Sequence, residues 1–241
     1  GRLPAVVDVL TEIIGPNVKM MQSMLFIKSE GKPGQAWHQD EAHIPTRDRS
    51  LTAAWIALDE ATVENGCLWV LPGSHRHGVL YPVREQNDPR FDCTAEAHGF
   101  GYGEQDAVPV ELPAGAALVF DGYLLHRSLP NTGRHGLRRA LVNHYMSAES
   151  LLPWFAPDSG ATMGTLDHRD VYLVAGEDPH AYKGTADNDA SPRSPRGRWR
   201  LFAVNRAVQA GCRVSRRGCL IVTAPQPSQL VQPPATGHAD L

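Results

Sequence analysis

The sequence lacks the patterns that mark several large classes of protein. Its 241 residues carry a net charge of −3, so no basic excess suggests a nucleic acid or an anionic membrane surface as a partner. No stretch approaches the roughly 18 uncharged apolar residues of a membrane span, and no basic-then-apolar signal region opens the chain. We therefore expect a globular protein whose partner is neither a nucleic acid nor a membrane, and no pattern indicates an oligomeric state.

Cysteine is also scarce. The four cysteines, Cys67, Cys93, Cys212 and Cys219, are scattered and form no CxxC pair. This spacing is unlike a disulfide framework or a zinc site and is typical of the reducing cytoplasm, where we expect the protein. No G-x-S-x-G, Walker loop or G-x-G-x-x-G followed by a helix is present, which argues against a serine hydrolase and a nucleotide-binding enzyme.

Short apolar runs separated by Gly and Pro recur along the first 146 residues. Many short strands at regular spacing predict a mostly β fold, a sandwich or barrel for which a jelly roll fits best. Residues 4–14 predict the end of a helix, and residues 82–105 predict a long surface loop. The expected strands cover residues 20–27, 51–58, 67–71, 108–112, 116–120, 124–128 and 137–146, with 108–112 and 116–120 joined as a hairpin.

The chain divides by composition near residue 184. We predict one domain over residues 1–184, with a truncated N-terminus because the chain opens on Gly1 without a starting methionine. From about residue 185 the sequence is rich in Arg, Ser, Pro, Ala and Gln, and one short apolar patch, Cys219–Val222, interrupts it. We therefore predict that residues 185–241 form a low-complexity, disordered tail.

The triplet His38-Gln39-Asp40 could supply two ligands to one metal ion. In a strand, residues i and i+2 point to the same face, so His38 and Asp40 would project together while Gln39 points away. His126 would then supply a third ligand from a distant strand, which completes the set typical of non-haem Fe(II) oxygenases. The triplet alone is a weak signal, because a chain with 11 histidines produces such a pairing readily by chance.

The adjacent Arg138 and Arg139 predict a second feature of this site. Alternation along the last strand places Arg138 and His144 on one face and Arg139 on the other, so one arginine should face inward. An unpaired inward guanidinium is costly, and the carboxylate of a bound keto acid would neutralise it. Ser128, two residues after His126, could face the same cavity. Two solvated edge-strand arginines are the alternative, which spacing alone leaves open.

These residues resemble the phytanoyl-CoA dioxygenase family of Fe(II)/2-oxoglutarate-dependent oxygenases. The similarity extends from about residue 20 to about residue 184, and its longest run, ENGCLWVLPGSH over residues 64–75, is specific. The other stretches that carry the similarity are Gln22-Ser23-Met24, Trp37-His38-Gln39-Asp40, Trp55-Ile56-Ala57-Leu58, His126-Arg127-Ser128 and Leu137-Arg138-Arg139-Ala140.

The resemblance implies a double-stranded β-helix with a few peripheral helices, which holds Fe(II) and binds 2-oxoglutarate. It implies that the metal ligands are His38, Asp40 and His126, and that Arg138 pairs with the distal carboxylate of 2-oxoglutarate. Family members also take a 2-oxoglutarate contact from a lysine upstream of the first metal ligand, and no lysine of this chain is assigned to that role. The implied 2-oxoglutarate contacts are Met24, Trp55, Ser128 and Arg138.

The implied activity is that of a dioxygenase, which uses O2 and 2-oxoglutarate to hydroxylate a small molecule and releases succinate and CO2. Asp40 favours hydroxylation, because a small residue at its position would open a halide site and favour halogenation. Nothing basic marks a coenzyme A site, so the family's name does not transfer to the substrate. The alternatives are a non-catalytic jelly-roll binding protein and a cupin-type metal-dependent hydrolase or isomerase.

Overall fold

The computed structural model describes residues 2–150, 172–181, 213–214 and 219–222, and every structural statement below concerns these residues. The chain begins with helix α1 (Pro4–Ile14), which has proline in its first turn, where a missing backbone N–H costs no hydrogen bond. None of the helices in the described ranges is both long and apolar enough to cross a bilayer.

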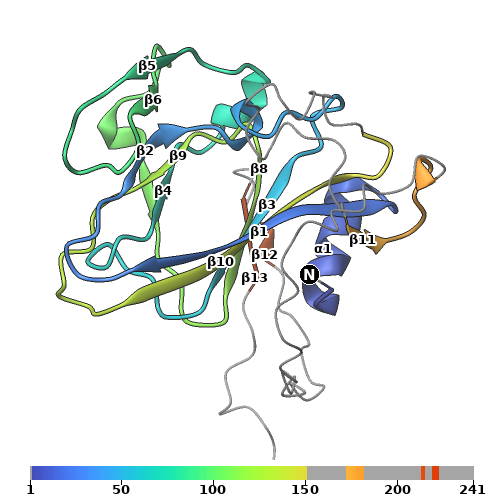
Figure 1. The fold of residues 1–241 in the computed structure, drawn as a ribbon, viewed down its shortest axis with the longest axis horizontal. Coiled ribbons are helices and arrows are strands. Elements are labelled where there is room, and N and C mark those ends of the chain that lie inside the picture. Colours follow the sequence, from blue (N-terminus) through green and yellow to red (C-terminus); the bar gives the residue numbers. More distant parts are fainter. Residues whose placement is uncertain (1, 151–171, 182–212, 215–218, 223–241) are drawn as a thin grey trace, which may run out of the picture.

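The larger sheet contains β1 (Val18–Lys28), β3 (Thr52–Ala57), β8 (Ala117–Asp121), β10 (Arg138–Ser147), β11 (Tyr172–Ala175), β12 (Arg213–Val214) and β13 (Cys219–Val222). Their order across the sheet is β11-β1-β10-β3-β8-β13-β12, and all neighbours pair antiparallel (Figure 1). The two long strands β1 and β10 lie side by side and place Lys28 directly opposite Arg138.

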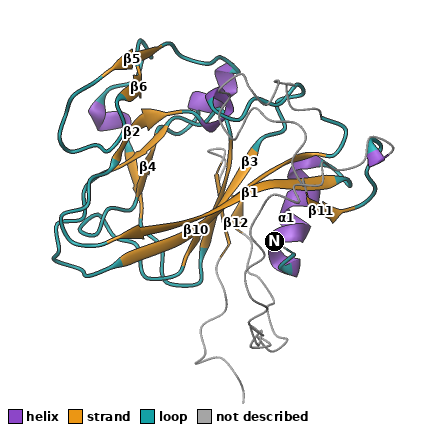
Figure 2. Ribbon diagram, viewed as in Figure 1, coloured by secondary structure: helices purple, strands orange, loops and turns teal. Residues whose placement is uncertain are grey.

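The smaller sheet contains β2 (Gln35–His38), β4 (Leu68–Val70), β7 (Val108–Val110) and β9 (His126–Ser128), in the order β2-β9-β4-β7. A separate hairpin consists of β5 (Val83–Glu85) and β6 (Ala95–Ala97) and lies beyond the smaller sheet (Figure 2). Single turns of 3-10 helix lie at η1 (Asp40–Ala42), η2 (Ser74–His77) and η3 (Glu104–Asp106).

The main hydrophobic core lies between the two sheets. Trp55 and Leu118 of the larger sheet are buried in one cluster with Leu68 and Val110 of the smaller sheet. A second cluster lies where α1 contacts the larger sheet and includes Val18, Val119 and Tyr145. Two facing antiparallel sheets, built from strands distant in sequence, confirm the predicted jelly roll, a double-stranded β-helix.

Two predictions of local structure were wrong. The segments predicted as a hairpin over residues 108–120 belong to different sheets, since β7 pairs with β4 whereas β8 pairs with β3 and β13. The turn between them carries the chain across the core, so each segment finds its partner elsewhere. The predicted loop over residues 82–105 contains β5, β6 and the start of η3, whose polar sequences hide the strand signal.

The predicted division of the chain at residue 184 stays a prediction. Strand β11 lies within the predicted domain and pairs with β1. Strand β13 lies within the predicted tail and pairs with β8, so that short apolar patch joins the larger sheet. Apart from β12 and β13, the predicted tail lies outside the described residues.

Candidate metal centre

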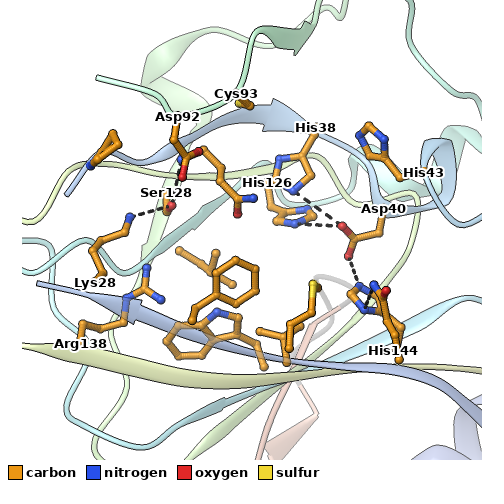
Figure 3. A pocket seen from close by; sticks show the side chains of 18 of the residues that line it. Lys28, His38, Asp40, His43, Asp92, Cys93, His126, Ser128, Arg138 and His144 are labelled. Atoms are coloured by element: carbon orange, nitrogen blue, oxygen red, sulfur yellow. Dashed lines mark hydrogen bonds and ion pairs between the residues drawn. The ribbon is translucent and has the colours of Figure 1, made fainter. Parts of the chain in front are cut away.

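A cavity of about 590 Å³ opens between the two sheets. Its walls come from β1, β3 and β10 of the larger sheet and from β2 and β9 of the smaller one, so the site depends on the closure of the whole fold. Figure 3 shows Asp40 and the imidazoles at one end, and at the other the cationic side chains of Lys28 and Arg138 together with Asp92. All seven residues predicted for the site line this cavity: Met24, His38, Asp40, Trp55, His126, Ser128 and Arg138.

His38, Asp40 and His126 meet in the cavity. The two histidines are direct cross-strand partners in β2 and β9, and their ring centroids lie 4.1 Å apart. Asp40 Oδ1 lies 3.7 Å from His38 Nε2 and 3.5 Å from His126 Nε2. One ligand atom from each of the three residues therefore falls within 4.8 Å of the others, a spacing that can hold one metal ion.

The route by which Asp40 reaches this cluster differs from the predicted one. Strand β2 ends at His38, and Asp40 opens the turn η1, so strand alternation does not orient its side chain. Gln39 points away, as predicted, and its buried amide donates hydrogen bonds to the carbonyl oxygens of Val79 (3.0 Å) and Tyr123 (2.8 Å). These bonds anchor the backbone between the two candidate ligands.

The imidazole rings are oriented for metal binding. His38 Nδ1 lies 2.8 Å from the carbonyl oxygen of Ala36, and His126 Nδ1 lies 2.9 Å from that of Leu124. Because a carbonyl oxygen can only accept, each Nδ1 carries the proton, and each Nε2 presents a lone pair to the cavity. This arrangement is the usual support for a metal-binding histidine.

The charge states of the cluster also suit a cation. Burial, reinforced by His126, lowers the pKa of His38 to about 4, so its ring is neutral near pH 7. Burial alone would raise the pKa of Asp40, but the imidazoles of His126 and His144 outweigh it and hold this pKa well below its usual range. Neutral imidazole and ionised carboxylate are the forms that bind metals.

Arg138 lies at the opposite end of the cavity, buried with 3% of its surface exposed. One of its nitrogens, Nη2, donates to the carbonyl oxygen of Gly66 at 3.0 Å, whereas Nε has no hydrogen-bond partner among the described residues. Its guanidinium carbon lies 5.3 Å from the ring centroid of Trp55. Arg139 instead faces solvent and pairs with Asp59 at 2.7 Å, so the predicted alternation of the two arginines is confirmed.

Lys28 is a site residue that the sequence interpretation missed. Its ammonium group donates to Ser128 Oγ (3.0 Å) and to the carbonyl oxygen of Leu129 (2.8 Å). Burial, followed by the charge of Arg138, lowers the pKa of Lys28 from 10.5 to about 7, while Asp92 opposes this shift. The predicted strand ended at residue 27, one position short of Lys28. Continuing its alternation from Met24 would have placed Lys28 inside the cavity.

Two further histidines lie near the cluster. His144 is buried in β10 and its Nε2 lies 3.0 Å from Asp40 Oδ2. His43 is exposed at the edge of the cavity, with its ring centroid 6.4 Å from that of His38. Strand alternation placed His144 on the same face as Arg138, and its contact with Asp40 connects it to the metal cluster.

Sequence comparison identifies the relatives of this chain. The family model for phytanoyl-CoA dioxygenase (PhyH) matches residues 2–140. A phytanoyl-CoA dioxygenase of Arabidopsis thaliana is 38% identical over 114 residues, covering 46% of this chain and 39% of the relative. The human peroxisomal phytanoyl-CoA dioxygenase is 32% identical over 156 residues, covering 61% and 45%. This chain therefore spans less than half of the length of these two curated relatives.

Solved structures with the same fold include non-haem oxygenases. The apo form of the non-haem monooxygenase ThoJ is 26% identical with a TM-score of 0.58, over 73% of this chain and 60% of ThoJ. EvdO2 from Micromonospora carbonacea var. aurantiaca, solved with 2-oxoglutarate, is 28% identical with a TM-score of 0.51, over 67% of this chain and 64% of EvdO2.

Proposed function

This chain belongs to the phytanoyl-CoA dioxygenase family, and from that premise we propose that it is a Fe(II)- and 2-oxoglutarate-dependent oxygenase. It hydroxylates a small molecule with O2 and releases succinate and CO2. One observation carries the proposal: a cluster able to hold a metal and a pair of buried cations lie at opposite ends of one cavity. Buried cations are ordinarily paired, and within the described part of the chain neither Lys28 nor Arg138 forms an ion pair, which fits a reactant that binds the metal and ends in a carboxylate.

Fe(II) is held by His38 and His126 through Nε2 and by Asp40 through Oδ1. This assignment is supported by the hydrogen bonds at each Nδ1 and by the convergence of the three ligand atoms. Two imidazoles and a carboxylate suit Fe(II) and leave coordination positions for the reactants. The bound iron supplies the redox chemistry with O2 and 2-oxoglutarate, while the protein binds and orients the reactants. Because position 40 carries a carboxylate and not a small residue that would open a halide site, the proposed reaction is hydroxylation and not halogenation.

The distal carboxylate of 2-oxoglutarate is held by Arg138 and Lys28. Both groups are buried, and among the described residues neither forms an ion pair, so an incoming carboxylate gains charge-assisted hydrogen bonds in a poorly solvated site. Ser128 fixes the Lys28 ammonium, and Trp55 flanks the Arg138 guanidinium. Lys28 precedes His38 in the chain, and we assign to it the lysine contact that the resemblance implies.

Apolar side chains complete the cavity. Met24 and Phe26 of β1 line it together with Phe120 and Val142. These walls exclude water from the reactants, which strengthens the electrostatic contacts inside and limits side reactions. We also propose that the protein is located in the cytoplasm, because the free thiols of Cys67 and Cys93 suit a reducing compartment.

The alternatives differ in what they require of these residues. A non-catalytic binding protein has no need of a complete metal cluster, and a cupin-type hydrolase or isomerase leaves Lys28 and Arg138 without an anion to bind. Incubating the chain with Fe(II), O2, 2-oxoglutarate and fractions of a metabolite extract separates them. We expect succinate formation that requires 2-oxoglutarate and rises with the fraction that contains the substrate. Binding of 2-oxoglutarate without any succinate indicates the binding protein, and turnover of a metabolite without 2-oxoglutarate indicates the hydrolase or isomerase.

A further inference from the structure

The two oxygens of the Asp40 carboxylate have different surroundings (Figure 3). Oδ1 faces the Nε2 atoms of His38 and His126, on the side where the metal would lie. Oδ2 faces away from them and lies 3.0 Å from His144 Nε2. The strands β2 and β9 orient the side chains of His38 and His126. Asp40 belongs to the turn η1 and not to a strand, so its carboxylate is oriented by the contact with His144.

His144 is itself held by a neighbouring strand. His144 in β10 and Gln22 in β1 are direct cross-strand partners, and Gln22 Nε2 lies 3.1 Å from His144 Nδ1. An ionised carboxylate only accepts hydrogen bonds, so His144 Nε2 must carry a proton. In the neutral ring Nδ1 then accepts, and the amide NH2 of Gln22 is the matching donor. The chain of hydrogen bonds from Gln22 through His144 to Asp40 is therefore self-consistent.

The number of oxygens that Asp40 offers to a metal decides how many positions remain open. Three protein ligands, each offering one atom, leave three positions for reactants on a six-coordinate ion. A carboxylate that bound through both oxygens would take one of these positions. The hydrogen bond from His144 occupies Oδ2 and opposes that second mode.

We propose that His144, held by Gln22, is a positioning residue that restricts Asp40 to a single metal-binding oxygen. This role rests on the proposed metal ligands. It means that a residue outside the ligand set decides how many oxygens of Asp40 bind the metal. Partners of metal ligands commonly change metal affinity or activity by 10–100-fold when removed. Here we expect the loss to appear mainly in the turnover of 2-oxoglutarate, with metal binding retained.

The test uses Zn(II) alone as the probe, because it does not react with O2. Infrared difference spectra of the Zn(II)-bound minus the metal-free chain, labelled with 13C at the aspartate carboxyl carbon, report how the carboxylate binds. The separation between its two stretching bands is larger for one bound oxygen than for two. The variants are His144→Leu, which removes the donor, His144→Gln, which can keep one, and Gln22→Leu. His43→Leu removes another imidazole of the same cavity without touching Oδ2.

We expect the one-oxygen spectrum in the unchanged chain, in His144→Gln and in His43→Leu. The spectrum of His144→Leu should move to the two-oxygen form, and that of Gln22→Leu should lie between the two. A two-oxygen spectrum in the unchanged chain, or an unaltered spectrum in His144→Leu, overturns the positioning role and leaves the metal site standing. Absence of Zn(II)-dependent aspartate bands from the unchanged chain overturns the metal site, and the positioning role with it.

Discussion

Replacing Lys28 with methionine should stabilise the protein and weaken its binding of 2-oxoglutarate. One pKa unit corresponds to about 1.4 kcal/mol, so a pKa lowered from 10.5 to about 7 means that the buried ammonium destabilises the fold by about 4 kcal/mol near pH 7. Methionine has a similar length and carries no charge. Its cost is the loss of the hydrogen bonds to Ser128 and Leu129, about 1 kcal/mol each. We expect a net gain of about 1 to 3 kcal/mol.

The size of the destabilisation by Lys28 depends on pH. The pKa of Lys28 is depressed in the folded protein, so the unfolded chain binds more protons between about pH 7 and 10.5. The destabilisation by Lys28 is therefore complete below about pH 7 and fades as the pH rises toward 10.5. The stability advantage of Lys28→Met over the unchanged chain should shrink over the same interval.

The assay is urea unfolding at several pH values, with and without saturating 2-oxoglutarate. Lys19→Met is a matched control, because Lys19 is a buried lysine of the same strand that pairs with Asp178 at 2.7 Å. That variant should lose stability, since it leaves a carboxylate unpaired. For Lys28→Met the affinity for 2-oxoglutarate should fall about 10–100-fold, the worth of a charge-assisted hydrogen bond. A destabilised Lys28→Met, or one that binds 2-oxoglutarate unchanged, would refute the reasoning.

Three further predictions concern the same end of the cavity. Affinity for 2-oxoglutarate should fall as the pH rises above about 7, by at most about tenfold per pH unit, because binding favours the protonated Lys28. Isothermal titration calorimetry at several pH values should show this fall in the unchanged chain and an affinity that does not vary with pH over the same range in Lys28→Met. Arg138→Ala should raise the 2-oxoglutarate concentration needed for half-maximal succinate formation about 10–100-fold, whereas Arg139→Ala, which faces solvent, should leave it unchanged. Gly66→Ala should lower the free energy of unfolding by about 1 to 3 kcal/mol in urea titrations, because Gly66 has φ 82° and its Cβ would lie 2.5 Å from the carbonyl oxygen of Leu129.

The sequence was most informative where strand alternation decides which face a side chain occupies. Along β10, alternation correctly put Arg138 and His144 on one face and Arg139 on the other, and the resemblance then chose Arg138 as the arginine that faces the cavity. The same rule, continued one residue further along β1, would have found Lys28. The end of a strand is difficult to locate from sequence, and a lysine at such an end is usually solvated. Lys28 is enclosed because β10 lies beside it, and this pairing is not visible in the sequence of β1.

Other features depend on contacts between distant segments and could not be predicted locally. Asp40 reaches the cluster from a turn, and its partner His144 lies 104 residues away. Apolar strands on both sides of a Pro-Ala-Gly turn resemble a hairpin in sequence, yet β7 and β8 pair in different sheets. The strand partners are set by how the two sheets close around the core, which is a property of the whole chain.

The most direct test of the central claim is succinate formation from 2-oxoglutarate by the chain and by Asp40→Ala. Asp59→Ala is the control, because Asp59 pairs with Arg139 outside the cavity. We predict Fe(II)- and O2-dependent succinate from the unchanged chain and from Asp59→Ala, and none above background from Asp40→Ala. Succinate formation by Asp40→Ala at the rate of the unchanged chain would contradict the assignment of Asp40 as an iron ligand and the account built on it.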